Sequence, residues 1–224
     1  MWFPKSALAA GSAIVLYVPM TEFSNASVAV PRRDYSGNGL DLTDNETIES
    51  GTTLPIPRGA NIRRANSEYL SRVSTPTLDI AGNYSEVVMI RANSTGIRQV
   101  LAMKYNGVDG YYTSIEASNR LGLANAAGAV TTGGTAVTNT SSPMLLCISF
   151  NATSANFKVQ KGPFDPQPYT TLTTSSAAQD FWFGRISATF TNSEFGMLAL
   201  WKNYALNSSE MDAMFPAFYG SGQG

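Results

Sequence analysis

The stretch Glu194–Trp201 reads EFGMLALW, and after Glu194 it is apolar at odd and even positions alike. Alternate residues of a β-strand point to opposite faces of its sheet, so a strand with this pattern has protein packed against both faces. We therefore expect a central strand here, in a fold that supplies one layer for each side of it.

Other short segments have the length and apolar pattern of strands, and Asn-Gly, Asp-Gly, Gly-Gly and Gly-Pro pairs between them are typical of turns. In one of them, Phe157 and Val159 fall on one face while Lys158 and Gln160 fall on the other. Together they predict an all-β fold, a two-sheet antiparallel sandwich. These segments are Ile14–Val18, Tyr84–Ala92, Val100–Tyr105, Tyr111–Glu116, Met144–Phe150, Asn156–Gln160 and Phe181–Ile186.

One helix is expected near the C-terminus. Asn207 is a good N-cap, and Glu210 stands where its side chain can reach back to the cap. Leu206 and Met211 form an apolar staple around this start. Pro216 disfavours helical geometry at the residue before it, so we expect the helix to end there and to cover about Ser208–Met214.

No linker or internal repeat divides the chain. The segment Ala124–Ser142, rich in Gly, Ala and Thr, is expected to be a long loop or a weak edge strand. We divide the chain into an N-terminal arm, one sandwich domain and a C-terminal tail, over residues 1–12, 13–216 and 217–224.

Composition excludes several classes of function. The 224 residues carry 15 basic and 16 acidic side chains, a net charge of −1, so we expect no electrostatic nucleic-acid binder. Only 14% of residues are charged, which suits a virion or extracellular protein. No histidine is present, which removes Ser-His-Asp and Cys-His catalysis. The single cysteine, Cys147, lies in an apolar run and is expected to be buried and inert.

The N-terminus allows two interpretations. Lys5 followed by Ser6–Val18 loosely resembles a signal peptide, but it is too short and too rich in Gly and Ser to span a bilayer. The interpretation that we favour is an apolar arm followed by a first strand. The aromatic residues of this arm, Trp2 and Phe3, would then dock on another subunit or a larger assembly, or fold back onto their own domain.

Motifs in a fixed order carry a family resemblance. The first motif is DYSGNGLDLT at residues 34–43, and the second is EYL at 68–70 with TLDI at 77–80, before the expected strand Tyr84–Ala92. The third is the strand pair Met144–Phe150 and Asn156–Gln160, which ends in Lys161-Gly162. The fourth is GMLALW at 196–201, followed by YALNSSEM at 204–211. In this order they resemble the laminin-G/concanavalin A-like jelly-roll domains, over residues 14–215. The resemblance implies a jelly-roll sandwich with one short C-terminal helix. The family's tryptophan is absent near Val88–Ile90, and Pro143-Met144 replaces its Trp-His pair.

The same superfamily includes glycoside hydrolases of the laminarinase type, which carry a Glu-x-Asp-x-x-Glu strand motif. Glycosidic cleavage needs two neighbouring carboxyl groups, and a strand presents them from alternate positions. Glu86, Glu116 and Glu194 each stand alone on their strands. We therefore expect no enzymatic activity, with a divergent polysaccharide hydrolase as the alternative.

Two candidate ligand sites remain. Asp34, Asp41, Asp44 and Glu46 supply enough oxygens for Ca²⁺, although a turn held by side-chain-to-backbone bonds is the interpretation that we favour; no other cofactor is expected. Sugar binding commonly uses an aromatic platform beside polar groups. The loop 105–112 supplies both, and Arg98 and Trp182 are weaker candidates. The alternative is that Tyr105 and one of Tyr111 and Tyr112 are ordinary core or sheet-face residues. The loop candidates are Tyr105, Asn106, Asp109, Tyr111 and Tyr112.

The hypothesis that follows is a non-enzymatic structural or adhesive module on the surface of a virion, most naturally a bacteriophage. Its partners would be other virion proteins or copies of itself, and a glycan of the host surface. A secreted or cell-surface lectin-like adhesion domain is the alternative. Fold supports many functions, so this hypothesis rests on analogy.

Overall fold

The computed structural model describes residues 13–20, 22, 30–46, 48–50, 59–106, 109–125, 130–137, 142–151, 153–159, 163, 165–168 and 179–219, without the side chains of 125 and 215–219. The strands are β1 (Ile14–Val18), β2 (Thr43–Asn45), β3 (Glu49–Ser50), β4 (Ala60–Ile62), β5 (Tyr69–Arg72), β6 (Tyr84–Ala92), β7 (Gln99–Tyr105), β8 (Gly110–Ile115), β9 (Arg120–Asn125), β10 (Val130–Ala136), β11 (Met144–Phe150), β12 (Ser154–Val159), β13 (Asp165–Pro168), β14 (Phe181–Phe183), β15 (Arg185–Ile186), β16 (Thr189–Phe190) and β17 (Ser193–Lys202). The helices are the 3₁₀ turns η1 (Arg64–Asn66) and η2 (Pro76–Leu78) and the α-helix α2 (Ser208–Tyr219).

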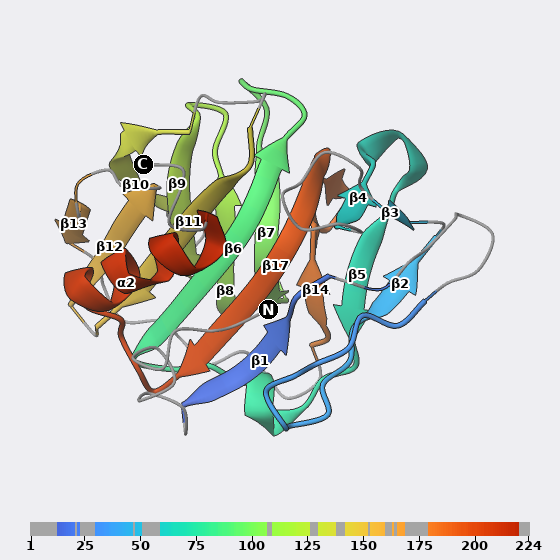
Figure 1. Cartoon of the computed structure of the whole chain (residues 1–224), viewed down its shortest axis with the longest axis horizontal. Coiled ribbons are helices and arrows are strands. Elements are labelled where there is room, and N and C mark those ends of the chain that lie inside the picture. The colour runs from blue at the N-terminus through green and yellow to red at the C-terminus, as the bar shows by residue number, and fades with distance from the viewer. Residues whose placement is uncertain are drawn as a thin grey trace.

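Two antiparallel sheets form the sandwich, which confirms the predicted fold class. The eight-stranded sheet has the order β13-β12-β11-β6-β17-β4-β3, and β1 also pairs with β17. The seven-stranded sheet has the order β10-β9-β8-β7-β14-β5-β2 and lies behind the first in Figure 1. A small third sheet is the hairpin β15–β16.

The main core lies between the two sheets. Inward side chains of both sheets meet there, and the rings of Phe183 on β14 and Phe195 on β17 make an edge contact with centroids 4.5 Å apart. The carboxyl group of Glu86 on β6 is buried in this layer beside Tyr84 and Thr113. Burial raises its pKa to about 7.

The outer face of the eight-stranded sheet is covered by helix α2 (Figure 1). Leu206, Met211 and Met214 pack on Met89, Cys147, Met197 and Trp201, so β17 is buried on both faces, as its sequence predicts. The predicted cap is also confirmed: the Glu210 amide donates to Asn207 Oδ1 at 3.0 Å, and the Asn207 amide donates to Glu210 Oε2 at 2.9 Å.

Several sequence expectations are corrected. The helix does not end at Pro216 but continues to Tyr219, because a proline removes one backbone donor without preventing later residues from adopting helical geometry. In the segment expected as a loop or a weak edge strand, the edge strand is the alternative that holds: it contains β10, which lies at the edge of the seven-stranded sheet, and the last two residues of β9. Phe181–Ile186 is two strands, broken at Gly184, whose φ is +86°. In the described part of the chain, no helix is long and apolar enough to cross a membrane.

Candidate functional site

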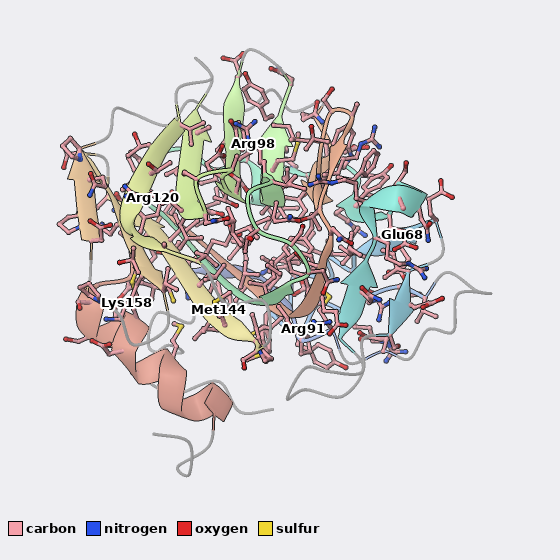
Figure 2. All side chains as sticks on the ribbon, turned by 90° about the horizontal axis from the view of Figure 1, so that it is seen from above. Glu68, Arg91, Arg98, Arg120, Met144 and Lys158 are labelled. Carbon is pink, nitrogen blue, oxygen red and sulfur yellow. The ribbon has the colours of Figure 1, made fainter. Side chains whose placement is uncertain are left out.

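The outer face of the seven-stranded sheet carries one continuous row of side chains. Residues paired directly across antiparallel strands point to the same face of a sheet. The register gives a row that crosses all seven strands: Thr43, Ser71, Trp182, Met103, Tyr112, Ala124 and Val130. Its large members are apolar or aromatic. Figure 2 shows α2 on the side of the molecule that carries Lys158, and Arg98 on the opposite side.

Aromatic rings gather at one end of this row. Tyr69 on β5 contacts the ring of Trp182 edge-on, with centroids 5.9 Å apart, and lies 6.2 Å from the ring of Phe190 on β16. All three side chains are half-buried, so each keeps part of its ring exposed to solvent. The guanidinium of Arg185 lies over all three, with its Cζ 4.3 Å from the Trp182 centroid, 4.6 Å from that of Tyr69 and 5.1 Å from that of Phe190.

A second aromatic pair lies on the other side of Met103. The rings of Tyr105 and Tyr112 are 5.8 Å apart in an edge contact. Tyr112 is almost fully buried under this surface, whereas Tyr105 is half-exposed. The Arg98 guanidinium lies 5.9 Å from the Tyr112 centroid and pairs with Glu116 at 2.8 Å. We call the surface formed by Tyr69, Tyr105, Tyr112, Trp182, Phe190, Arg98 and Arg185 the aromatic face.

The hairpin β15–β16 brings Arg185 and Phe190 to this face. The Gly184 amide donates to the Leu101 carbonyl at 2.8 Å, and the Thr191 amide donates to the Gly184 carbonyl at 2.8 Å, which anchors both ends of the hairpin. Arg64 fixes it from the side, because its Nε donates to the Phe190 carbonyl at 2.6 Å and its Nη2 to the Arg98 carbonyl at 2.7 Å. Burial lowers the pKa of Arg64.

The predicted sugar loop is divided by the sheet. Tyr105 and Tyr112 belong to the aromatic face, and so do the weaker candidates Arg98 and Trp182. Tyr111 does not: it is fully buried between the sheets, with its ring 5.0 Å from that of Tyr84, and cannot contact a sugar. The reason is strand parity, since neighbours on β8 point to opposite faces.

Asn106 and Asp109 form the turn that joins β7 to β8. The Asp109 amide donates to Asn106 Oδ1 at 2.7 Å, and the Asn106 amide donates to the Asp109 carbonyl at 3.2 Å. These bonds give the side-chain oxygen of Asn106 a local structural role. Arg185, Tyr69 and Phe190 were missed by sequence reasoning, because they come from strands of two to four residues that show no alternating pattern.

Three of the four acidic residues considered for Ca²⁺, Asp34, Asp41 and Asp44, accept hydrogen bonds from protein donors. Asp34 accepts from the amides of Tyr17, Ser36 and Leu40 and from the Ser36 hydroxyl, with distances of 2.8 to 3.0 Å. Asp41 accepts from the Asp34 amide at 2.8 Å. Asp44 is fully enclosed in a two-bond ion pair with Arg32. The side chains therefore build the turn instead of converging on an ion, and no group of three acidic or thiol ligands occurs among the described residues.

The carboxyl groups considered for glycosidic cleavage lie apart. Glu86 is in the core, Glu116 pairs with Arg98 on the aromatic face, and Glu194 pairs with Arg91 at 2.6 Å. Cys147 is buried as predicted, and burial raises the pKa of its thiol to about 12. Trp2 and Phe3 lie outside the described residues.

No family model matches the chain, and no curated sequence matches it. Solved structures do. The binding domain of paraclostridial mosquitocidal protein 1 is similar over 94% of this chain and 53% of that one, with a TM-score of 0.70 and 11% identity. A structure of botulinum neurotoxin type C, whose cell entry is described as dependent on two ganglioside molecules, covers 94% and 52%, with a TM-score of 0.67 and 10% identity.

Domain 4 of AbnA, a GH43 extracellular arabinanase from Geobacillus stearothermophilus, was solved in complex with arabinotriose. It is similar over 91% of this chain and 98% of that one, with a TM-score of 0.66 and 13% identity. The chain thus spans about half of the toxin structures and nearly all of the arabinanase domain. What they share is the fold: a β-sandwich of the jelly-roll type.

Proposed function

We propose that the protein is a non-enzymatic carbohydrate-binding module and that the aromatic face binds the sugar. The observation that carries this proposal is the set of half-exposed rings, Tyr69, Tyr105 and Trp182, on an outer sheet face beside Arg98 and Glu116. Aromatic rings cover the apolar face of a pyranose, and flanking charged groups hydrogen-bond its hydroxyls.

Two further points support the proposal. The arabinanase domain of the same fold was solved with a bound trisaccharide, and it matches this chain along nearly its whole length. The sequence motifs resemble laminin-G/concanavalin A-like domains, among which sugar binding is common. Against catalysis, Glu86 is enclosed in the core, and Glu116 and Glu194 each pair with an arginine.

The test is a glycan array probed with the full chain, followed by calorimetry on the best oligosaccharide. We expect Trp182→Ala to weaken binding at least about tenfold, because the stacking of a sugar ring on one aromatic side chain supplies a large part of the binding free energy of a weakly bound saccharide. Tyr35→Ala is the matched control, since Tyr35 is an exposed aromatic, 57% accessible, outside the aromatic face. Circular dichroism checks that both variants fold. Equal affinity of the two variants, or no glycan bound by the wild type, contradicts the proposal.

We further propose that the module acts on the surface of a virion, a bacteriophage being the setting that the low charge and polar surface suggest. Trp2 and Phe3 would dock it on other virion proteins or on copies of itself. Deletion of residues 1–10 is then expected to abolish incorporation into the particle or oligomer and to leave the melting temperature unchanged. A truncated protein that melts many degrees lower would place the two aromatics in the domain's own core. A mature N-terminus between Ala10 and Met20, found by mass spectrometry, would favour the secreted lectin instead.

A further inference from the structure

Arg185 is a cation that forms no ion pair with any acidic residue in the part of the chain that the structure describes. Its Nε donates to the Ser187 carbonyl at 2.8 Å, and its other contacts are the three rings beneath it. Among the described residues, the ion pairs of Arg32, Arg63, Arg91 and Arg98 each include a carboxylate, whereas Arg185 forms none.

The rings hold this cation in one orientation. A guanidinium within about 6 Å of an aromatic centroid is attracted by the ring, and three rings around one guanidinium fix its plane. Arginine has five N–H donors in a planar fork, and one of them is used here by Ser187. The remaining donors form an edge that fits the two oxygens of a carboxylate.

The surroundings add positive charge. Arg64 is bonded to the carbonyls of Phe190 and Arg98, two residues of the aromatic face, and has no carboxylate partner among the described residues. Arg120 is exposed and lies on β9 four residues before Ala124, the member of the outward-facing row on that strand. Glu116 compensates Arg98 alone. Although the whole chain has a net charge of −1, the four arginines named here, Arg64, Arg98, Arg120 and Arg185, outnumber the one carboxylate of the described residues that pairs with any of them, Glu116.

We propose that the ligand of the aromatic face is an acidic saccharide, and that the free edge of Arg185 binds its carboxylate while the sugar ring lies against Trp182 and Tyr105. This inference rests on the proposed function and adds the chemical class of the sugar. A neutral sugar offers the guanidinium edge only hydroxyl and ether oxygens, whereas a uronic or sialic acid supplies a carboxylate that matches it in charge and shape.

The experiment compares sugars that differ only in charge. The probes are 3′-sialyllactose with lactose, and trigalacturonate with its methyl ester, each titrated calorimetrically into the full chain. We expect at least one acidic member to bind about tenfold more tightly than its neutral partner at low ionic strength, with a preference that shrinks as salt is added. Arg185→Gln should remove the preference, and Arg185→Lys should retain part of it, because lysine keeps the charge but not the planar fork. Arg33→Gln, the loss of an exposed arginine outside the aromatic face, should leave it unchanged.

The outcomes separate the two proposals. Equal affinity for charged and neutral partners, or a preference that survives in Arg185→Gln, overturns the acidic-sugar inference and leaves carbohydrate binding standing. Failure of every saccharide on the array overturns both. Tighter binding of oligothymidylate than of any saccharide also overturns both, because aromatic rings with arginines can bind single-stranded nucleic acid as well.

Discussion

At the scale of single residues, Glu86 is a buried carboxyl group whose ionisation links folding to pH in the range below neutrality. Hydroxyl groups of Tyr84 and Thr113 donate to its Oε2, the latter at 2.7 Å, while its Oε1 has no hydrogen-bond partner among the described residues. Removal from water disfavours the charged form, which is why its pKa is about 7 instead of the ordinary 4.5. The carboxyl group is thus largely protonated in the folded protein below neutral pH.

This shift predicts a pH dependence of stability. The pKa is higher in the folded than in the unfolded chain, so the folded state binds more protons between the two values. The contribution of Glu86 is therefore full below about pH 4.5 and is lost as pH rises through about 7. The change corresponds to ~3 kcal/mol in the free energy of unfolding. In Glu86→Gln this loss should be absent, so the variant should gain stability relative to the wild type between about pH 5 and pH 8 in urea titrations. Parallel pH profiles for the two proteins would contradict the assignment.

At the scale of elements, the hairpin β15–β16 depends on one glycine. Gly184 has a φ of +86°, and a Cβ there would lie 2.9 Å from Ile62 Cδ1 and 3.4 Å from Thr191 Cγ2. Glycine is the residue that adopts such a φ without steric cost, and it also leaves room for the Ile62 side chain. The placement of Arg185 and Phe190 therefore follows from the absence of a side chain at 184.

Gly184→Ala should lower the free energy of unfolding by about 1–3 kcal/mol and weaken sugar binding at the aromatic face. Gly96→Ala is the matched control, because Gly96 also has a positive φ, +72°, but no atom lies within 4 Å of its Cβ position. It should show only the cost of the backbone angle and keep the wild-type affinity. Urea titrations and calorimetry of both variants provide the comparison. If both lose the same stability, the contact with Ile62 is unimportant.

Elements differed in how well the sequence predicted them. The long strands β6, β11 and β17 were predicted within one residue at each end, since burial of one or both faces leaves a clear apolar pattern. Strands β2, β3, β4 and β5 have two to four residues, too few for a period to show. They are strands because the neighbouring strand offers hydrogen bonds, which no local pattern records.

The sequence predicted only part of the candidate site, because the rest depends on how strands pair. Sequence shows that Tyr111 and Tyr112 face opposite ways, but not which one points inward. The pairing of Tyr112 with Met103 decides that, and it depends on an irregularity in the β7–β8 register between Val100 and Met103. Arg185 was not predicted because one of its partners, Tyr69, is distant in sequence, and because the short hairpin that pairs Arg185 with Phe190 shows no strand pattern.

At the scale of the whole molecule, the two outer faces of the sandwich differ in what covers them. Helix α2 covers the eight-stranded sheet with apolar side chains and with the ion pair of Lys158 and Asp212 at 2.9 Å (Figure 2). On the seven-stranded sheet, every member of the aromatic face except Tyr112 keeps part of its surface in water. The proposed sugar site and the packing of α2 therefore lie on opposite sides of the sandwich.

The covered side also allows the opening rate of helix α2 to be measured. Cys147 is the chain's one thiol; it packs in the cluster that α2 closes, and it is paired in register with Lys158. We expect a thiol reagent in solution to reach this buried sulfur when the helix leaves the sheet. At high reagent concentration, the labelling rate equals the rate at which the helix opens. Mass spectrometry follows it as the increase in protein mass, with no substitution needed to introduce a thiol. The same measurement made with a sugar bound would tell whether a ligand on the aromatic face changes the rate at which α2 opens on the opposite side of the sandwich.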